Sequence, residues 1–196
     1  MPHVLWSSVC ALVLTLGVSL CAQANWYLDG ESSRLSFITT QNANVANVHR
    51  FLVLHGKVDG KGLAKLLIEM DSVNSDVPLR DERMRDVVFD FKHFAEAQIT
   101  AQIDLPLINE LASGAQIELH LPVTVSLRGK QHTYDAQLLA TRLDERRFQV
   151  VTLEPLVLQA EDFGLQSSLE TLRTLAGSSA ISLSVPVNAV LIFTAR

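Results

Sequence analysis

Residues 116–139 read QIELHLPVTVSLRGKQHTYDAQLL, and this stretch decides the fold. Its first arm, up to Leu127, alternates apolar and polar residues without a break, which is typical of a long strand with one dry and one wet face. A tight turn at Gly129-Lys130 would pair Leu127 with His132 and keep the dry faces of both arms together. Arms of about 35 Å, at about 3.3 Å per residue, predict a barrel or a sandwich.

Composition places the chain among globular proteins. It has 196 residues, of which 19% are charged and 48% hydrophobic, so it is long enough for one domain with a substantial core. The formal net charge is -5, and no basic stripe is present that could neutralise phosphates. We therefore expect no nucleic-acid partner.

The first 24 residues contain no Asp, Glu, Lys or Arg, and residues 4–20 are almost continuously apolar. The sequence Ala22-Gln23-Ala24 fits the small-x-small cleavage rule, which predicts a secretory signal peptide over 1–24 and a mature barrel domain over 25–196. An uncleaved anchor and a lipoprotein signal ending at Cys21 are the alternatives. Both cysteines, Cys10 and Cys21, lie in this segment, so we expect no disulfide in the mature protein.

Period-two patterns continue along the rest of the chain. They predict strands at 34–39, 48–58, 63–70, 98–105, 148–158 and 179–195. The stretch 48–58 has apolar residues on both parities, which we interpret as burial on both faces at one end. Two short helices are expected, one over 79–88 after Pro78 and one over 167–175 with Ser167 as its cap and Gly177 as its stop. Residues 41–47, which lie between the first two predicted strands, are expected to form a loop or an irregular edge.

Residues that could carry chemistry are sparse. The histidines lack metal-ligand spacing, and the mature chain has no cysteine, nucleophile elbow or phosphate-binding loop, so we predict no metal, no cofactor and no enzyme activity. His132 and Tyr134 share a parity beside the hairpin turn and are the candidate acid and base of an alternative, enzymatic interpretation. Arg80, Arg83 and Arg85 could clasp an acidic head group, although a solvated helix face is the simpler interpretation.

Several motifs in this order resemble the YceI-like, polyisoprenoid-binding family across nearly all of the mature chain. The residues that carry the resemblance are Trp26-Tyr27-Leu28-Asp29, Ser33 to Phe37, Gly56 to Gly60, Arg80 to Arg85 with Phe89-Asp90-Phe91, Leu121 to Gly129, and Asp162 to Leu165. The resemblance implies an all-β fold, a lipocalin-like antiparallel eight-stranded β-barrel with one or two short helices, in the bacterial periplasm. It also implies a tunnel that takes an isoprenoid or other acyl chain. The chain departs from the family pattern at Thr39-Thr40-Gln41, where many members have a basic residue and a histidine.

We therefore expect a periplasmic carrier that sequesters a polyisoprenoid, a quinone tail or a fatty acyl chain in its barrel. A filled barrel that binds a protein partner is the alternative. Further expectations are a homodimer and no stable membrane insertion after signal cleavage. Parity and aromatic size select the ligand-binding residues Phe37, Phe51, Ile68, Phe89, Phe91, Ile99, Ile103, Val123, Val125, Tyr134, Leu158, Phe163 and Leu183.

Overall fold

The computed structural model describes residues 25–196. The predicted signal peptide, residues 1–24, lies outside the described residues and stays a prediction. Within the described part of the chain, no helix has both the length and the apolar character needed to span a bilayer.

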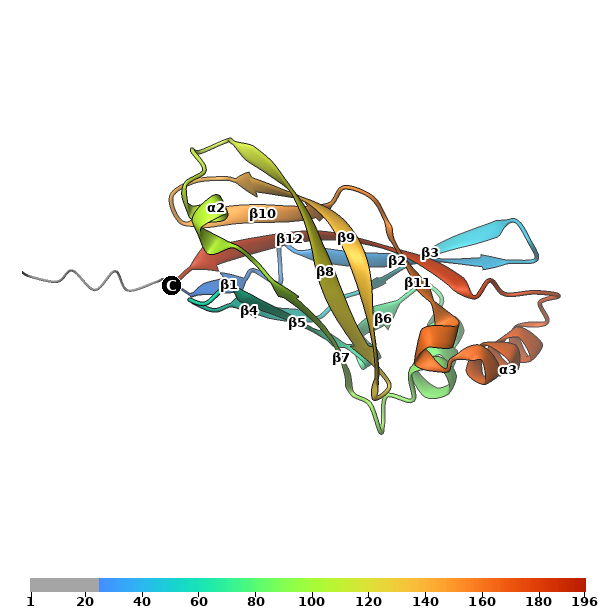
Figure 1. The fold of residues 1–196 in the computed structure, drawn as a ribbon. Helices are drawn as coiled ribbons and strands as arrows, with labels where there is room; N and C mark the ends of the chain where they lie inside the picture. Colours follow the sequence, from blue (N-terminus) through green and yellow to red (C-terminus); the bar gives the residue numbers. More distant parts are fainter. Residues whose placement is uncertain (1–24) are drawn as a thin grey trace, which may run out of the picture.

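The described residues form an antiparallel β-barrel (Figure 1). Eight strands close the ring in the order β1-β4-β5-β7-β8-β9-β10-β12, and β12 pairs with β1. Their bounds are β1 (Trp26–Leu28), β4 (Leu54–Val58), β5 (Leu63–Glu69), β7 (Glu96–Gln102), β8 (Gln116–Leu127), β9 (Lys130–Arg142), β10 (Arg147–Thr152) and β12 (Ser184–Ala195). The predicted eight-stranded lipocalin-like barrel is confirmed.

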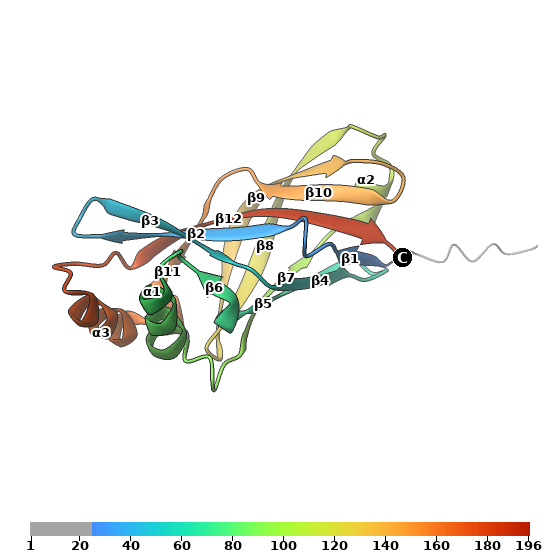
Figure 2. The same cartoon turned by 180° about the vertical axis from the view of Figure 1, so that it is seen from behind.

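Four further strands extend the barrel wall at one end. They are β2 (Arg34–Gln41), β3 (Val45–Phe51), β6 (Val73–Asn74) and β11 (Leu156–Gln159). Strands β2 and β11 pair with the first half of β12, and β3 pairs with β2. The β2–β3 hairpin projects past the barrel on the side of the helices, as both views show (Figures 1 and 2).

Two predicted strands prove to be interrupted. The stretch 48–58 splits into the end of β3 and β4, and Leu52 at the break is 57% exposed, so the expectation of burial on both faces is wrong. The apolar residues fall on both parities because the chain kinks between the two strands. Likewise 148–158 splits into β10 and β11. The expected loop at 41–47 shrinks to a turn at 42–44, where Asn42 and Ala43 have positive φ angles.

The β8–β9 hairpin forms as expected, with a register shifted by two residues. Leu127 pairs with Lys130 and Val125 with His132, so the turn is Arg128-Gly129 and not Gly129-Lys130. Both turn residues have positive φ, 50° and 74°, as a type I′ turn requires. The Arg128 guanidinium holds this geometry by donating to the Val88 carbonyl at 3.1 Å and the Ser168 hydroxyl at 2.8 Å. An even shift leaves the dry face unchanged.

Helices cover both ends of the barrel. Helix α1 (Pro78–Arg83) starts with Pro at its first turn and continues into the π-helical η2 (Met84–Phe89), which together match the first predicted helix. Helix α3 (Gln166–Ala176) matches the second and ends at Gly177, but Leu165 and not Ser167 is its N-cap. Helix α2 (Leu105–Asn109) covers the opposite end, and two 3₁₀ turns are η1 (Met70–Ser72) and η3 (Ala160–Phe163).

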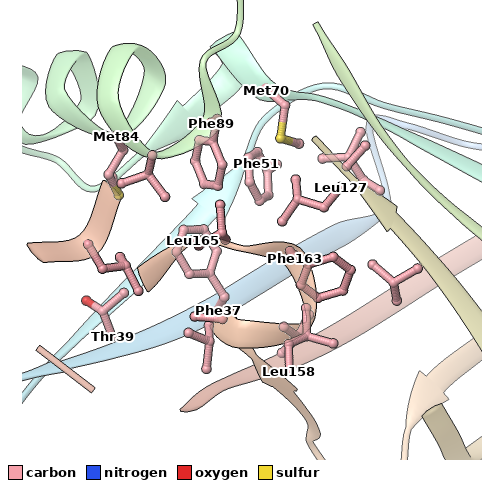
Figure 3. A pocket seen from close by; sticks show the side chains of 18 of the residues that line it. Phe37, Thr39, Phe51, Met70, Met84, Phe89, Leu127, Leu158, Phe163 and Leu165 are labelled. Carbon is pink, nitrogen blue, oxygen red and sulfur yellow. The ribbon is translucent and has the colours of Figure 1, made fainter. Parts of the chain in front are cut away.

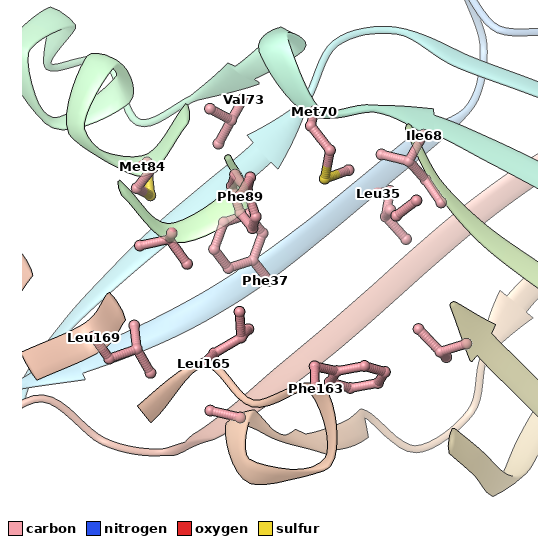
Figure 4. Close-up of a cluster of buried hydrophobic side chains, with 14 of the residues drawn as sticks. Leu35, Phe37, Ile68, Met70, Val73, Met84, Phe89, Phe163, Leu165 and Leu169 are labelled. Atoms are coloured by element: carbon pink, nitrogen blue, oxygen red, sulfur yellow. The ribbon is translucent and has the colours of Figure 1, made fainter. Parts of the chain in front are cut away.

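The interior divides into two apolar clusters along the barrel axis. One cluster lies beneath α2 and consists of Trp26, Val58, Leu105, Ile108, Ala140, Phe148, Val150 and Phe193. The other lies beneath α1, η2 and α3 and includes Phe37, Ile68, Met70, Phe89 and Phe163 (Figure 4). We call these the closed end and the open end, because the cavities described below begin at the second cluster.

Candidate functional site

An apolar chamber of about 130 Å³ lies at the open end. Phe37 of β2, Phe51 of β3 and Phe89 of η2 gather on one side, with Met70 above them and Phe163 of η3 opposite (Figure 3). The ring centroids of Phe37 and Phe51 are 5.4 Å apart, and those of Phe51 and Phe89 are 5.7 Å apart. The wall that faces the empty space is apolar, and a cavity of this size and lining stays dry and favours an apolar guest.

A second cavity of about 120 Å³ continues deeper into the barrel. It shares Leu35, Ile99 and Val187 with the chamber, so these three side chains form the partition between the two spaces. Beyond them the wall consists largely of small and branched residues, including Ala101, Val123, Ala136 and Ala189. The deeper cavity ends at Phe193 of the closed end.

A third cavity of about 230 Å³ forms the mouth, between β2, β3, α1 and α3. It shares Thr39, Met84, Leu169 and Leu172 with the chamber. All three cavities follow the inward face from Ile181 to Phe193, which spans about 40 Å at about 3.3 Å per residue. The spaces together outline a tunnel with a polar mouth and an apolar interior.

Ten of the thirteen predicted ligand-binding residues lie on the walls of these spaces. Phe37, Phe51, Ile68, Phe89, Val125, Leu158 and Phe163 line the chamber. Ile103 and Val123 line the deeper cavity, and Ile99 lines both. Whether any of them touches a ligand stays a prediction.

The other three predicted residues lie elsewhere. Phe91 follows the helical segment and packs against the open-end cluster from outside the chamber, beside the ammonium group of Lys92. Leu183 also packs against that cluster but lines none of the three cavities. Its carbonyl accepts a hydrogen bond from Ala160 N at 2.8 Å, where η3 joins the barrel. Tyr134 is drawn toward η3 by its hydroxyl group.

Tyr134 closes a seam in the barrel wall. Strand β10 pairs with β9 only from Leu138 onward, so the first half of β9 faces β11 and η3 without a ladder. The Tyr134 hydroxyl bridges this seam by donating to Asp162 Oδ2 at 2.6 Å and accepting from Gln159 N at 3.3 Å. Burial and the bond to Asp162 raise the pKa of Tyr134 to about 12. Tyr134 is therefore a structural donor and not a base at neutral pH, and neither it nor His132 lines a described cavity.

Several wall residues were missed by the sequence interpretation. Leu165, Leu169 and Leu172 line the chamber from α3 and the turn before it, and Met70 and Met84 line it from η1 and η2. The spacing of the three leucines is i, i+4, i+7, which is the signal of an apolar helix face and would have found them. Met70 lies on the dry parity of the strand predicted at 63–70 and Met84 on the apolar spacing of the first predicted helix, so the pattern marked both as inward but not as part of a cavity wall.

The site has the chemistry of a binding cavity. In residues 25–196 no group of three or more His, Cys, Asp or Glu side chains is placed to hold a metal ion. The chamber and the deeper cavity are each smaller than the roughly 300–1,000 Å³ typical of pockets for drug-sized ligands. A long chain that occupies both must therefore displace partition side chains such as Leu35 and Ile99. Unbranched methionine side chains at the chamber wall can adapt to such a guest.

Comparisons with known proteins agree with this architecture. The YceI-like domain family matches residues 26–193. A polyisoprenoid binding domain from Saccharophagus degradans, implicated in plant cell wall breakdown, is 36% identical with a TM-score of 0.86 and covers 87% of this chain and 98% of its own. Burkholderia cenocepacia BcnA is 17% identical with a TM-score of 0.60, and the match covers 84% of this chain and 98% of BcnA. The Campylobacter jejuni YCEI protein is 15% identical with a TM-score of 0.50, and the match covers 76% of this chain and 84% of that protein. No curated protein sequence matches the chain.

Fold and site together define a lipocalin-like barrel with an internal apolar tunnel. The chain belongs to the YceI-like family, because the family match spans nearly all of the described residues and the Saccharophagus domain exceeds 30% identity over most of the chain.

Proposed function

We propose that this protein is an exported, periplasmic carrier that sequesters a long apolar chain, a polyisoprenoid, a quinone tail or a fatty acyl chain, in its tunnel. One observation carries the proposal: three adjoining cavities follow the inward face from Ile181 to Phe193, and of these three only the outermost exposes polar atoms to its space. The polyisoprenoid binding domain of Saccharophagus degradans, which shares the fold at 36% identity, supports a hydrophobic ligand.

Burial of the guest supplies the affinity. Each Å² of apolar surface removed from water contributes about 25 cal/mol, so a long chain gains several kcal/mol even after the cost of ordering it. Since the wall of the chamber offers almost no fixed polar partners, the tunnel selects its guest by length, width and apolarity. We therefore propose binding and release, without turnover, as the activity.

Blocking the partition between the chamber and the deeper cavity tests the proposal. Ile99 lines both spaces, so Ile99→Trp fills the junction from inside. Thr133→Trp is the matched control, because Thr133 is exposed on β9 and points to the outer face opposite Thr124. Both variants are incubated with a long-chain prenol or fatty alcohol, and the bound lipid is measured by mass spectrometry after gel filtration.

We expect Ile99→Trp to retain about one tenth of the wild-type lipid or less, while Thr133→Trp retains all of it. Circular dichroism and thermal unfolding must show that both variants are folded, and since the side chain enters existing space, the loss of stability should stay below about 3 kcal/mol. Unchanged lipid uptake by a folded Ile99→Trp protein would contradict the proposed tunnel.

Export and assembly have their own checks. N-terminal sequencing of the protein from a periplasmic extract should begin at Asn25, the residue after the predicted cleavage site. A chain that begins at Met1 in that extract would contradict cleavage.

The expected homodimer is checked by sedimentation of the mature protein. The predicted result is a single species of about twice the mature mass.

A further inference from the structure

The mouth of the tunnel differs in chemistry from the chamber it adjoins. It is lined by residues from β2, β3, α1 and α3, and the polar ones are Thr39, Gln41, His49, Arg80 and Arg83. No aspartate or glutamate lines it within residues 25–196. The head of a lipid whose tail occupies the chamber would therefore meet a cationic and hydrogen-bonding environment.

Arg80 and Arg83 lie three residues apart on α1, so both side chains project from the same face of the helix. Both are half-buried, and in the described chain neither guanidinium has a hydrogen-bond partner or a carboxylate within ion-pair distance. Other arginines are engaged: Arg128 donates to Ser168, and Arg173 pairs with Glu170. Two half-buried guanidinium groups with free donors are suited to bind an oxyanion bidentately.

His49 supplies a second, independent observation. Its side chain is on β3, lines the mouth, and is 99% buried, since only 1% of the residue is exposed. Nε2 is 2.7 Å from the Thr39 hydroxyl, whereas Nδ1 has no hydrogen-bond partner. A buried polar atom without a partner is rare in folded proteins, and this one leaves a hydrogen-bonding position of the imidazole unused. When Thr39 donates to Nε2, the proton is on Nδ1, which can then donate to an oxygen in the mouth.

The neighbouring carboxylate of Asp81 forms no ion pair with Arg80 or Arg83 among the described residues. Asp81 is buried on the same helix, and its Oδ1 accepts from both Ser75 N and the Ser75 hydroxyl. Burial and the charge of Arg80 hold the pKa of His49 at about 4, although Asp81 opposes them, so the imidazole is neutral at neutral pH. The positive charge of the mouth therefore comes from the two arginines alone.

We propose that the mouth binds the anionic head of the carried lipid, with Arg80 and Arg83 pairing with its oxyanion and His49 Nδ1 donating to the same group. The inference rests on the proposed function, because the tail must occupy the chamber for the head to lie here. The shared chemistry is an oxyanion on a long apolar chain, which a prenyl diphosphate and a fatty acid both provide.

Two matched ligand pairs test the proposal and separate these sources. Geranylgeranyl diphosphate is compared with geranylgeraniol, and palmitate with hexadecanol, by equilibrium dialysis against the full mature protein. We expect at least one anion to bind about tenfold more tightly than its neutral partner, as hydrogen bonds to charged groups predict. A preference in the prenyl pair alone identifies a phosphorylated isoprenoid, and a preference in the palmitate pair alone identifies a fatty acid.

The variant Arg80→Gln/Arg83→Gln should reduce that preference to about threefold or less, mainly by lowering the affinity for the anionic ligand. Arg85→Gln is the control, because Arg85 points away toward the Asp71 carbonyl and should leave the preference intact. Binding of the anion should also raise the pKa of His49, measured by NMR of ¹⁵N-labelled histidine, whereas the neutral alcohol should leave it near 4.

The outcomes distinguish this inference from the proposed function. The proposed anionic head site is contradicted if the neutral alcohols bind as tightly as the anions, or if the preference for the anion persists in Arg80→Gln/Arg83→Gln. Either result leaves the proposed carrier function intact. If none of the four ligands binds the wild-type protein, the carrier and the head site fall together.

Discussion

The two ends of this barrel are built from the same kinds of side chain, but the aromatic rings fill one end and surround a cavity at the other. At the closed end, Trp26 meets Phe148 edge-on at 4.7 Å between ring centroids, and Phe148 stacks on Phe193 at 5.2 Å. The wall there is completed by Val58 and Ala140, both fully buried. Aromatic rings that pack on one another leave little space, so this end stabilises the fold.

At the open end the aromatic rings stand around a space and do not fill it. Phe37, Phe51 and Phe89 contact one another along one wall, and Phe163 lies across the chamber from them (Figure 3). Strand residues such as Val125 and Leu158 and helical residues such as Leu169 complete the wall around this space. The comparison teaches that a filled end can carry the stability of a barrel while a hollow end carries its binding function.

The largest expected effect is a loss of stability from a substitution at the closed end. Phe148→Ala removes a ring that is 2% exposed and contacts two aromatic partners, so we expect a loss of about 3–5 kcal/mol in the free energy of unfolding. Phe51→Ala at the chamber is the comparison and should cost less than about 3 kcal/mol, because one side of that ring already faces empty space. Urea unfolding measures both, and equal losses would contradict the division into two ends.

A smaller effect concerns pH at the mouth. Because the pKa of His49 falls from 6.5 to about 4 on folding, the unfolded chain binds a proton first as the pH is lowered. Stability should therefore decrease between about pH 6.5 and pH 4, by about 3 kcal/mol. In His49→Gln this part of the decrease should disappear. A variant with the same pH dependence as wild type would show that another group titrates in this range.

The smallest effect concerns the seam between β9 and β11. Tyr134→Phe removes the hydroxyl that bonds to Asp162 and Gln159, and we expect a loss of about 1–2 kcal/mol with the fold retained. Since folding raises the pKa of Tyr134 from 10 to about 12, its contribution is present below pH 10 and lost as the pH rises toward 12, and the variant should lack that loss. Faster hydrogen exchange at the Gln159 amide would locate the effect, and unchanged exchange there would argue against a bridged seam.

The long strands could be predicted from the sequence because each has one dry face. The alternation from Gln116 to Leu127 and from Ser184 to Ala195 follows directly from a barrel wall with an inside and an outside. Details that depend on a single backbone angle could not be predicted. The hairpin register shifted because Arg128, a residue that rarely adopts a positive φ, forms the turn with Gly129, and its side-chain bonds to Val88 and Ser168 are long-range contacts.

The candidate site was predictable only in part for a related reason. Parity shows which side of a strand faces inward, and so Val123, Val125 and Ile99 could be placed on the inner wall. Parity does not show whether the inner space is filled. It also cannot show that Tyr134, on an inward parity, turns to a carboxylate from η3, or that His49 is buried at the mouth with a free ring nitrogen.

The most direct test of the account is mass spectrometry of an organic extract from the protein, purified from the periplasm without detergent. The account predicts about one isoprenoid or acyl lipid per protein chain in the wild type and a strongly reduced amount in Ile99→Trp. An extract that contains no lipid, and that stays empty after incubation of the protein with long-chain prenols and fatty acids, would contradict a hollow, lipid-carrying end.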